Sequence, residues 1–248
     1  MKFNILIALC IVFIFLTSCN FTTRQKIESE LKEPLSVYPT KNLEDFYDKE
    51  GYRDSNFSKD DKGVWMLISV LSKRNEEGKI KREGVKLYID RNTRKSEGYF
   101  YVDNSSKDER KNVQKEYPLI MKNNKLILKD KNVDEDIKRK LKDFKFFVQF
   151  GNLSELYQYK EKDASFNSLA PNYLISYDLS QNDDNLKEIQ KLYGIKAGEN
   201  PELNIYGDGD FKSDAIKSNT VNYKLNGKVG RFYNSVVSYK PKRGMTYE

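Results

Sequence analysis

The two cysteines of this 248-residue chain, Cys10 and Cys19, both lie near its N-terminus, and the sequence contains no histidine. Residues 20–248 therefore form no disulfide and no cysteine or histidine metal site that could hold a fold together. Ser-His-Asp and Cys-His catalysis and a histidine pH switch are excluded as well. The roughly 230 residues after position 18 are enough to bury a real hydrophobic core, so the fold must depend on apolar packing.

The first residues follow the order of a secretory signal. Lys2 precedes an uninterrupted apolar run over 5–16, and polar sequence begins at Thr17. At about 1.5 Å per residue the run covers roughly 18 Å, less than the ~30 Å hydrocarbon core of a bilayer. The alternatives are an uncleaved anchor or a buried core helix, but a core helix would show a polar face, which this run lacks. We expect residues 1–18 to be a cleaved signal peptide.

The sequence Leu16-Thr17-Ser18-Cys19 resembles the bacterial lipobox. The resemblance implies a diacylglyceryl group on the Cys19 sulfur, cleavage between Ser18 and Cys19, and the option of acylation, for example with palmitate, on the new amine. Each buried methylene contributes about 0.8 kcal/mol, so two or three long chains anchor a protein durably. This predicts a protein anchored by lipid on the extracellular face of the cell membrane.

The remaining chain divides into a linker and a folded part. Residues 19–41 are polar, contain Pro34 and Pro39 and lack a sustained apolar stripe, which predicts a lipidated N-terminus and a flexible tether. Residues 42–248 are expected to form a single domain, because an aromatic content of 13% is typical of folded chains. The excess of 44 Lys and Arg over 37 Asp and Glu is too small to predict a nucleic-acid partner.

Strand patterns dominate both ends of this domain. The apolar run 64–71 is typical of a strand buried on both faces, and Val85, Leu87 and Ile89 alternate with polar neighbours as in a half-buried strand. Turn residues predict one hairpin around 91–96 and a second around 122–125. Asn226-Gly227 is the strongest hairpin signal. Further strands are predicted at 98–102, 116–120, 126–128, 173–179, 203–206, 221–233 and 235–239.

Helical periodicity is confined to the middle of the domain. The first predicted helix is capped by Asn132 and Glu135 and ends at Gly151; a shorter one runs from Asn152 through Tyr159. A third begins at Asp183 or Asp184 and ends at Gly194. The apolar positions of the first helix are Val133, Ile137, Leu141, Phe144 and Val148. Together these patterns predict an α+β fold, an antiparallel sheet with helices packed mainly on one face.

The stretch GVKLYIDRNTRKSEGYFYV at 84–102, together with VWMLISVL at 64–71 and the lipobox, resembles the staphylococcal tandem-type lipoproteins, also called the conserved staphylococcal antigen family. The resemblance spans the whole chain. It implies membrane-anchored paralogues encoded in tandem and linked to host-cell entry and innate immune stimulation. The family has no established catalytic residues, so only Cys19 carries over.

Two groups of cations are candidate contacts for an anion or a partner. Arg91 and Arg94 lie in a predicted turn, whereas Lys138, Lys142 and Lys145 have helical spacing and could face anionic lipid or a wall polymer. A solvated helix face explains the second group equally well. The acidic stretch 206–214 (YGDGDFKSD) does not match a calcium loop, since Lys and Ser occupy required positions. We expect no metal and no cofactor.

The leading functional hypothesis is a non-enzymatic, monomeric, lipid-anchored protein that binds a host-cell protein or an envelope polymer. One alternative is an envelope carrier or chaperone that encloses an apolar ligand. Another is a carboxylate-dependent enzyme acting on wall glycans. A large apolar cavity would favour the carrier, and two facing carboxylates would favour the enzyme. A flat exposed aromatic face would favour the binding protein; Tyr223, Tyr233 and Tyr239 are its candidates among the seventeen tyrosines, with ordinary sheet packing as the alternative reading.

Overall fold

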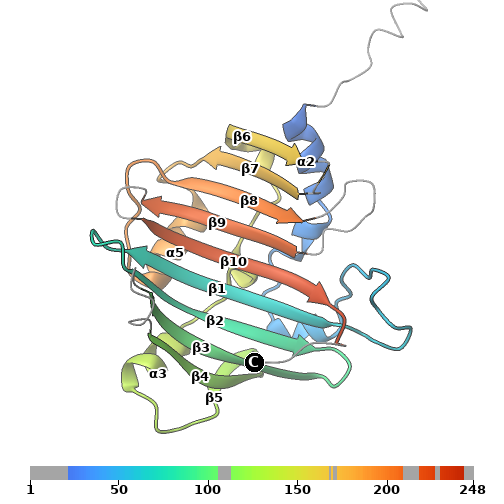
Figure 1. Ribbon diagram of the computed structural model, residues 1–248, viewed down its shortest axis with the longest axis vertical. Helices are drawn as coiled ribbons and strands as arrows, with labels where there is room; N and C mark the ends of the chain where they lie inside the picture. The colour runs from blue at the N-terminus through green and yellow to red at the C-terminus, as the bar shows by residue number, and fades with distance from the viewer. Residues whose placement is uncertain are drawn as a thin grey trace, which may run out of the picture.

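The computed structural model describes residues 22–105, 113–167, 169, 172–208, 218–226 and 230–242. Its main feature is a ten-stranded sheet in which all neighbouring strands are antiparallel (Figure 1). The antiparallel sheet predicted from the sequence is confirmed. Its strands are β1 (Val64–Arg74), β2 (Ile80–Asp90), β3 (Lys95–Ser105), β4 (Val113–Lys122), β5 (Lys125–Leu128), β6 (Lys160–Asn167), β7 (Asn172–Asp178), β8 (Glu202–Asp208), β9 (Ser218–Asn226) and β10 (Arg231–Lys240).

The strand order is β5-β4-β3-β2-β1-β10-β9-β8-β7-β6. Within each half of the sheet, strands that are consecutive in sequence are neighbours in space, and β1 pairs with β10 at the centre. The strands that come first and last in the sequence, β1 and β10, therefore join the two halves of the sheet, as Figure 1 shows where the cyan and red strands meet.

Predicted turns connect the strands of the first half. β2 and β3 are joined at residues 91–94, where Arg94 has a φ of +52°. β4 and β5 are joined by Asn123 and Asn124, whose φ angles of +52° and +59° suit a two-residue hairpin and are tolerated by asparagine. Both hairpins are confirmed. β9 and β10 also pair, but Gly227 of their predicted turn lies outside the described residues.

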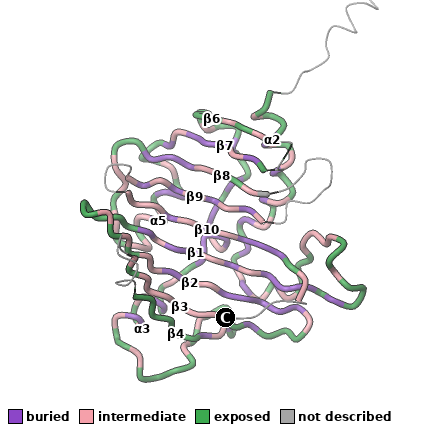
Figure 2. Tube along the Cα trace, in the orientation of Figure 1, coloured by how far each residue is buried: buried purple, intermediate pink, exposed green. Residues whose placement is uncertain are grey.

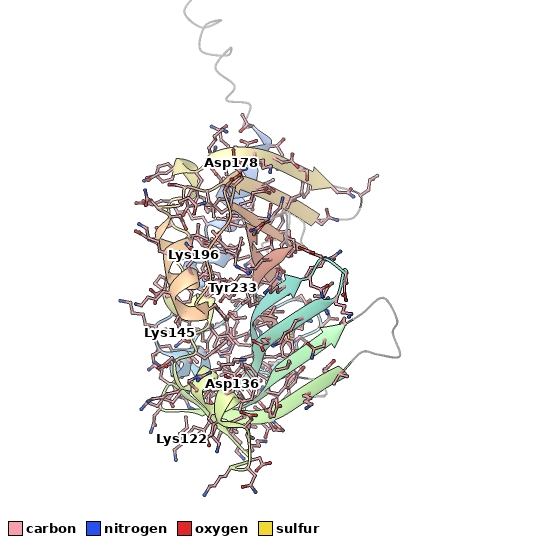
Figure 3. All side chains as sticks on the ribbon, turned by 90° about the vertical axis from the view of Figure 1, so that its left-hand side faces the viewer. Lys122, Asp136, Lys145, Asp178, Lys196 and Tyr233 are labelled. Carbon is pink, nitrogen blue, oxygen red and sulfur yellow. The ribbon has the colours of Figure 1, made fainter. Side chains whose placement is uncertain are left out.

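The helices are short and lie on one side of the sheet in Figure 3, where the sheet is seen edge-on. The helical segments are α2 (Thr23–Leu31), η1 (Pro34–Val37), η2 (Leu43–Tyr47), α3 (Glu135–Lys142), α4 (Phe147–Phe150), η4 (Leu156–Gln158) and α5 (Asp184–Tyr193). α2 contacts β6 and β7, α3 contacts β5, and α4 contacts β10.

α5 begins and ends where its sequence signals predict. The Asp183 carboxylate accepts a hydrogen bond from the backbone N–H of Leu186 at 2.7 Å, which satisfies one of the free donors at the helix start. Gly194 follows the helix in a left-handed conformation with a φ of +59°, which glycine adopts without steric cost. This predicted helix is confirmed.

The single central helix predicted from residue 132 to Gly151 is wrong. α3 ends at Lys142, and α4 is a separate turn that begins at Phe147. The N-cap of α3 is Asp134, not Asn132, and the predicted helix from Asn152 to Tyr159 is only the 3-10 turn η4. The break has a packing reason: the consecutive residues 146–148 are all buried, and three adjacent residues cannot share one face of a helix.

The flexible tether predicted over 19–41 is also wrong for its described part, residues 22–41. α2 begins with a capping box between Thr22 and Gln25. Ile27 and Leu31 are fully buried, and the Arg24 guanidinium donates to the carbonyl oxygens of residues 156, 157 and 159 at 3.0–3.2 Å. An apolar residue recurs every four positions, at Ile27, Leu31 and Leu35. Such a stripe stabilises a helix only when it packs against another surface, here the edge of the sheet.

β6 was not predicted. Its sequence KEKDASFN offers only Ala164 and Phe166 as inward-facing apolar residues, and it forms an edge of the sheet. Charged side chains along an edge strand discourage pairing with another chain.

The core lies between the sheet and the helices, and buried positions alternate along the strands in Figure 2. Phe147 is at its centre, with its ring centroid 5.4 Å from that of Tyr223, 5.5 Å from Tyr38 and 6.2 Å from Tyr233. Its backbone N–H donates to Ser69 Oγ at 3.1 Å. The hydroxyls of Tyr38, Tyr193, Tyr223 and Tyr233 are buried and have no hydrogen-bond partner among the described residues.

Candidate functional site

The candidate site lies on the sheet face that points away from the helices, here called the outer face. Side chains alternate along each strand, so every second residue belongs to this face. Cα pairing places Ile68 of β1, Lys86 of β2 and Tyr99 of β3 side by side in one row. Their neighbours in sequence, Leu67, Val85 and Phe100, have the opposite orientation and are nearly fully buried. The alternation thus separates the outer face from the core.

Lys86 is the central cation of this face. Its Nζ lies 4.9 Å from the ring centroid of Tyr88 and 5.7 Å from that of Tyr99, within cation–π range. Burial by itself would lower the pKa of Lys86, but the interactions with Tyr88 and Tyr99 outweigh it and raise the pKa. Lys86 therefore remains charged at neutral pH and is held between aromatic rings.

A shallow hollow of about 130 Å³ opens beside Lys86. The rings of Tyr99 and Tyr101, two residues apart on β3, are 6.0 Å apart between centroids. Burial, above all, raises the pKa of Tyr101 to about 12, so its hydroxyl remains protonated. Asp103 is held by Arg82 at 2.6 Å. The hollow is lined by Ile68, Lys86, Tyr99, Tyr101, Asp103 and Gln114, and so combines aromatic surface with hydrogen-bonding groups.

A row of amides crosses the other half of the outer face. Asn222 Nδ2 donates to Asn234 Oδ1 at 2.6 Å, and Asn204 Nδ2 donates to Asn222 Oδ1 at 3.2 Å. Ser176 Oγ donates to Asn204 Oδ1 at 2.7 Å. Each amide carries two N–H donors, and the row uses one from Asn204 and one from Asn222, so further hydrogen-bonding capacity remains. This row is called the amide row below.

Arg91 and Arg94 are not brought together as an anion site. Arg91 is 9% exposed and donates to the Lys62 carbonyl at 2.7 Å and to the Tyr239 hydroxyl at 2.5 Å. Arg94 is exposed and forms a two-point ion pair with Asp48, at 2.5 and 3.2 Å. That pairing holds the pKa of the Asp48 carboxyl below its ordinary value. Both arginines have partners within the fold.

Lys138, Lys142 and Lys145 do not form one helical stripe, because α3 ends at Lys142. Lys138 pairs with Glu135 at 2.7 Å. Lys142 and Lys145 are exposed and form no ion pair with any described residue. Lys145 lies in the segment between α3 and α4, on the helix side of the molecule (Figure 3), where it lines a cleft.

Ser18 and Cys19 lie outside the described residues, as does the acidic stretch beyond Asp208. In the ranges that the structure does describe, no group of three or more acidic side chains is placed to hold a metal ion. None of the helices there is both long and apolar enough to cross a bilayer.

Sequence reasoning missed the residues that make the outer face. The tyrosines proposed for an exposed platform, Tyr223, Tyr233 and Tyr239, are buried in the core, so that prediction is wrong. Tyr99 and Tyr101 fall in a predicted strand with the spacing of two that places them on one face. Asn222 lies beside Tyr223 in a predicted strand, which was a signal of alternation, whereas Asn234 falls between two predicted strands. Their alignment across strands depends on the β8–β9–β10 register, which no local pattern supplies.

These features define a class: an α+β domain that presents a broad, mixed aromatic and amide sheet surface. The chain belongs to the Csa1 family, whose model matches residues 23–242. The family resemblance noted in the sequence is thereby confirmed. The matched range begins at α2, which agrees with a folded part that starts well before residue 42.

Relatives from staphylococci match nearly the full length. An uncharacterized lipoprotein of Staphylococcus epidermidis is 37% identical over 97% of this chain and 96% of its own. An uncharacterized protein of Staphylococcus aureus strain MW2 is 38% identical, covering 98% and 94%, and an uncharacterized lipoprotein of strain N315 is 36% identical, covering 98% and 93%. The match to a solved DUF1329 family protein from Desulfovibrio piger covers 76% of this chain and 90% of that protein, with 10% identity and a TM-score of 0.21.

Proposed function

We propose that this protein is anchored by lipid at Cys19 on the outer side of the cell membrane, and that it binds a host protein through its outer face without catalysing a reaction. The observation that carries the proposal is the outer face itself. Tyr99 lies against a charged Lys86 and beside Tyr101 on one half of the face, and the amide row crosses the other half. Tyrosine supplies large contact area at low entropy cost, and amides supply adaptable hydrogen bonds, the combination found in protein-binding surfaces.

The charges of this face favour a protein over an anionic envelope polymer. A polyanion requires cations that are available, but Arg82 is paired with Asp103 at 2.6 Å and Lys224 with Glu202 at 2.8 Å. Lys86 is engaged with tyrosine rings. An envelope polymer is therefore the competing outcome of the experiment below.

The carboxylates of the cleft near Lys145 favour the binding proposal over a wall-glycan hydrolase. Such an enzyme needs a carboxylic acid with a raised pKa. Glu83 and Asp143 both line the cleft near Lys145. Burial would raise the pKa of Glu83, but Lys81 and Lys140 outweigh it and hold this pKa below its ordinary value. Glu83 is ionised at neutral pH and is a poor general acid.

Anchoring rests on the lipobox and on the lipoprotein names of the relatives. Since Thr22 caps α2 only three residues after Cys19, the lipid is at most about 10 Å of chain from the folded domain. α2 packs on β6 and β7, so this edge of the sheet is proposed to lie nearest the bilayer.

The anchor is tested by Cys19→Ala. Metabolic labelling with a radioactive fatty acid is expected to disappear, and the precursor is expected to retain its signal peptide. A mature N-terminus at residue 19 and unchanged membrane retention in Cys19→Ala would contradict the anchor.

The partner is tested by placing a photoreactive phenylalanine analogue at position 99 of the protein displayed on intact cells. Illumination with host cells is expected to yield covalent adducts that contain a host protein. The matched control carries the analogue at Lys196, an exposed position on the helix side in Figure 3. Equal adducts from both positions would overturn the use of the outer face, and adducts of wall polymer alone would overturn a protein partner.

A further inference from the structure

A cleft of about 280 Å³ opens on the helix side, at some distance in the fold from the outer face. Its floor is formed by strands β1–β3, and its walls by the end of α3, the segment 143–146 and the end of α5. The segment exists only because the central helix is broken after Lys142. The cleft is thus a product of the same packing that buries Phe146 and Phe147.

The interior of this cleft is largely apolar. Leu71 and Phe100 contribute from the sheet, and Phe144 and Leu192 contribute from the helix side. Phe100 is only 2% exposed, so the floor is part of the core. A ligand that fills this space must bring an apolar body.

One polar atom in the interior lacks a hydrogen-bond partner. The Tyr193 hydroxyl is buried and lies within bonding geometry of no described residue, although it interacts with the equally buried Tyr233 hydroxyl and the residue lines the cleft. Burial is the main cause that raises the pKa of Tyr193 well above its ordinary value, so the hydroxyl keeps its proton and can donate. A buried hydroxyl without a partner is costly, and an acceptor atom on a ligand would relieve that cost.

The mouth of the cleft carries charge, most of it already paired. Arg139 is held by Asp136 at 2.5 Å, and Lys140 by Glu83 at 3.0 Å and Asp136 at 2.9 Å. Lys145 forms no ion pair with any described residue. It is therefore the cation that an incoming anion would meet, even though Asp143 also lines the mouth.

The volume limits the ligand. A cavity of about 150 Å³ holds one benzene molecule, so a cleft about twice that size takes roughly ten to twelve non-hydrogen atoms. Pockets for drug-sized ligands are about 300–1,000 Å³, so a long acyl chain does not fit. The cleft is therefore smaller than the apolar cavity that a lipid carrier would need.

We propose that the cleft between α3, α5 and strands β1–β3 binds a small amphipathic carboxylic acid, with its apolar body against Phe100, Phe144 and Leu192, its carboxylate near Lys145 and an acceptor atom near the Tyr193 hydroxyl. This goes beyond the proposed function, because it concerns another surface and a small molecule. Either proposal can fail alone.

The test uses 4-phenylbutyrate as probe, with 4-phenylbutanol and 4-phenylbutylamine as neutral and cationic analogues. Binding to the full protein in lipid nanodiscs is measured by equilibrium dialysis, and empty nanodiscs correct for partition into lipid. Saturable one-to-one binding of the acid is expected, with at least tenfold weaker binding of both analogues. Absence of saturable binding, or equal binding of the three probes, would overturn the proposal.

Two lysine variants make the test specific. Lys145→Glu is expected to weaken binding of the acid at least tenfold. Lys142→Glu makes the same charge change at an exposed, unpaired lysine that does not line the cleft, and is expected to change binding less than twofold. Equal losses in the two variants would reduce the effect to general electrostatics and overturn the assignment of Lys145.

Tyr193→Phe removes only the hydroxyl and is expected to weaken binding of the acid about threefold to tenfold. Unchanged affinity would overturn the role of the Tyr193 hydroxyl. The photocrosslinking at position 99 tests the outer face. A negative result in the ligand-binding experiment would therefore overturn the cleft proposal without affecting the proposed function.

Discussion

Two rows of residues cross strands β7–β10 one position apart in each strand, and they face opposite sides of the sheet. The inner row, which faces the helices, is fully buried. The outer row is the amide row, whose three asparagines are half-buried. The inner row consists of Tyr177, Leu203, Tyr223 and Tyr233, and the outer row of Ser176, Asn204, Asn222 and Asn234.

The rows satisfy their polar atoms differently. In the outer row the amides and the serine bond to one another at 2.6–3.2 Å. In the inner row the hydroxyls of Tyr223 and Tyr233 have no partner among the described residues, so apolar burial of the rings must outweigh that cost. A slip of one residue in register would exchange the two rows, which is why this register is strongly specified.

The largest effect is expected for Phe147→Ala, because Phe147 is fully buried against the inner row. Its removal should lower the free energy of unfolding by about 3–5 kcal/mol, measured by urea denaturation. Phe232→Ala is the matched control, since Phe232 adjoins Tyr233 but is only half-buried. Similar losses in both variants would refute the distinction between the faces.

The outer row is tested by Asn222→Ala, which removes the central member of the amide row. The variant deletes the hydrogen bonds to Asn204 and Asn234 and should lower the free energy of unfolding by about 1–2 kcal/mol. The same denaturation measurement applies. A loss as large as that of Phe147→Ala would show that the amide row is part of the core in energetic terms.

The third prediction concerns the stability contributed by an ion pair at the edge of the inner face, between Lys140 of α3 and Glu83 of β2. The folded-state pKa of Glu83 is lowered. The stabilisation that ionised Glu83 gives to the fold is therefore fully present above the unfolded-state pKa and is lost as the pH falls through the folded-state pKa. Glu83→Gln should reduce stability by about 0.5–1 kcal/mol at pH 7, since the pair is partly exposed.

The difference between wild type and Glu83→Gln should vanish in acid, below the folded-state pKa of Glu83. Thermal unfolding monitored from pH 7 to pH 3 checks this. A difference that grows as the pH falls would have the wrong sign for an ionised, paired Glu83.

The smallest change is expected for Tyr223→Phe, next to Asn222 in the chain. It removes a hydroxyl without a partner and keeps the buried ring, so the free energy of unfolding should stay within about 0.5 kcal/mol of wild type or rise. A loss comparable to that of Asn222→Ala would show that the Tyr223 hydroxyl has a partner in solution.

Local signals were enough for much of the fold. A continuous apolar run identified β1, and alternating apolar residues identified β2. The asparagine pair at 123–124 identified a hairpin, and Asp183 and Gly194 marked the ends of α5. Each of these signals acts over fewer than about a dozen residues, so the chain carries it regardless of its surroundings. The candidate site was less accessible: of the five cations singled out, Lys145 lines a cleft, whereas Arg91 and Arg94 are paired within the fold.

The sequence by itself determined that residues 20–248 fold without disulfides or histidine, that strands dominate, and that the chain belongs to its family. Only the tertiary structure decided that β1 pairs with β10, that α2 packs on β6 and β7, and that the central helix breaks between Lys142 and Phe147. The amide row and the cleft follow from those contacts. Both features join residues that are far apart in sequence. Their contacts stabilise the fold only when both surfaces are present, so no local sequence pattern predicts them.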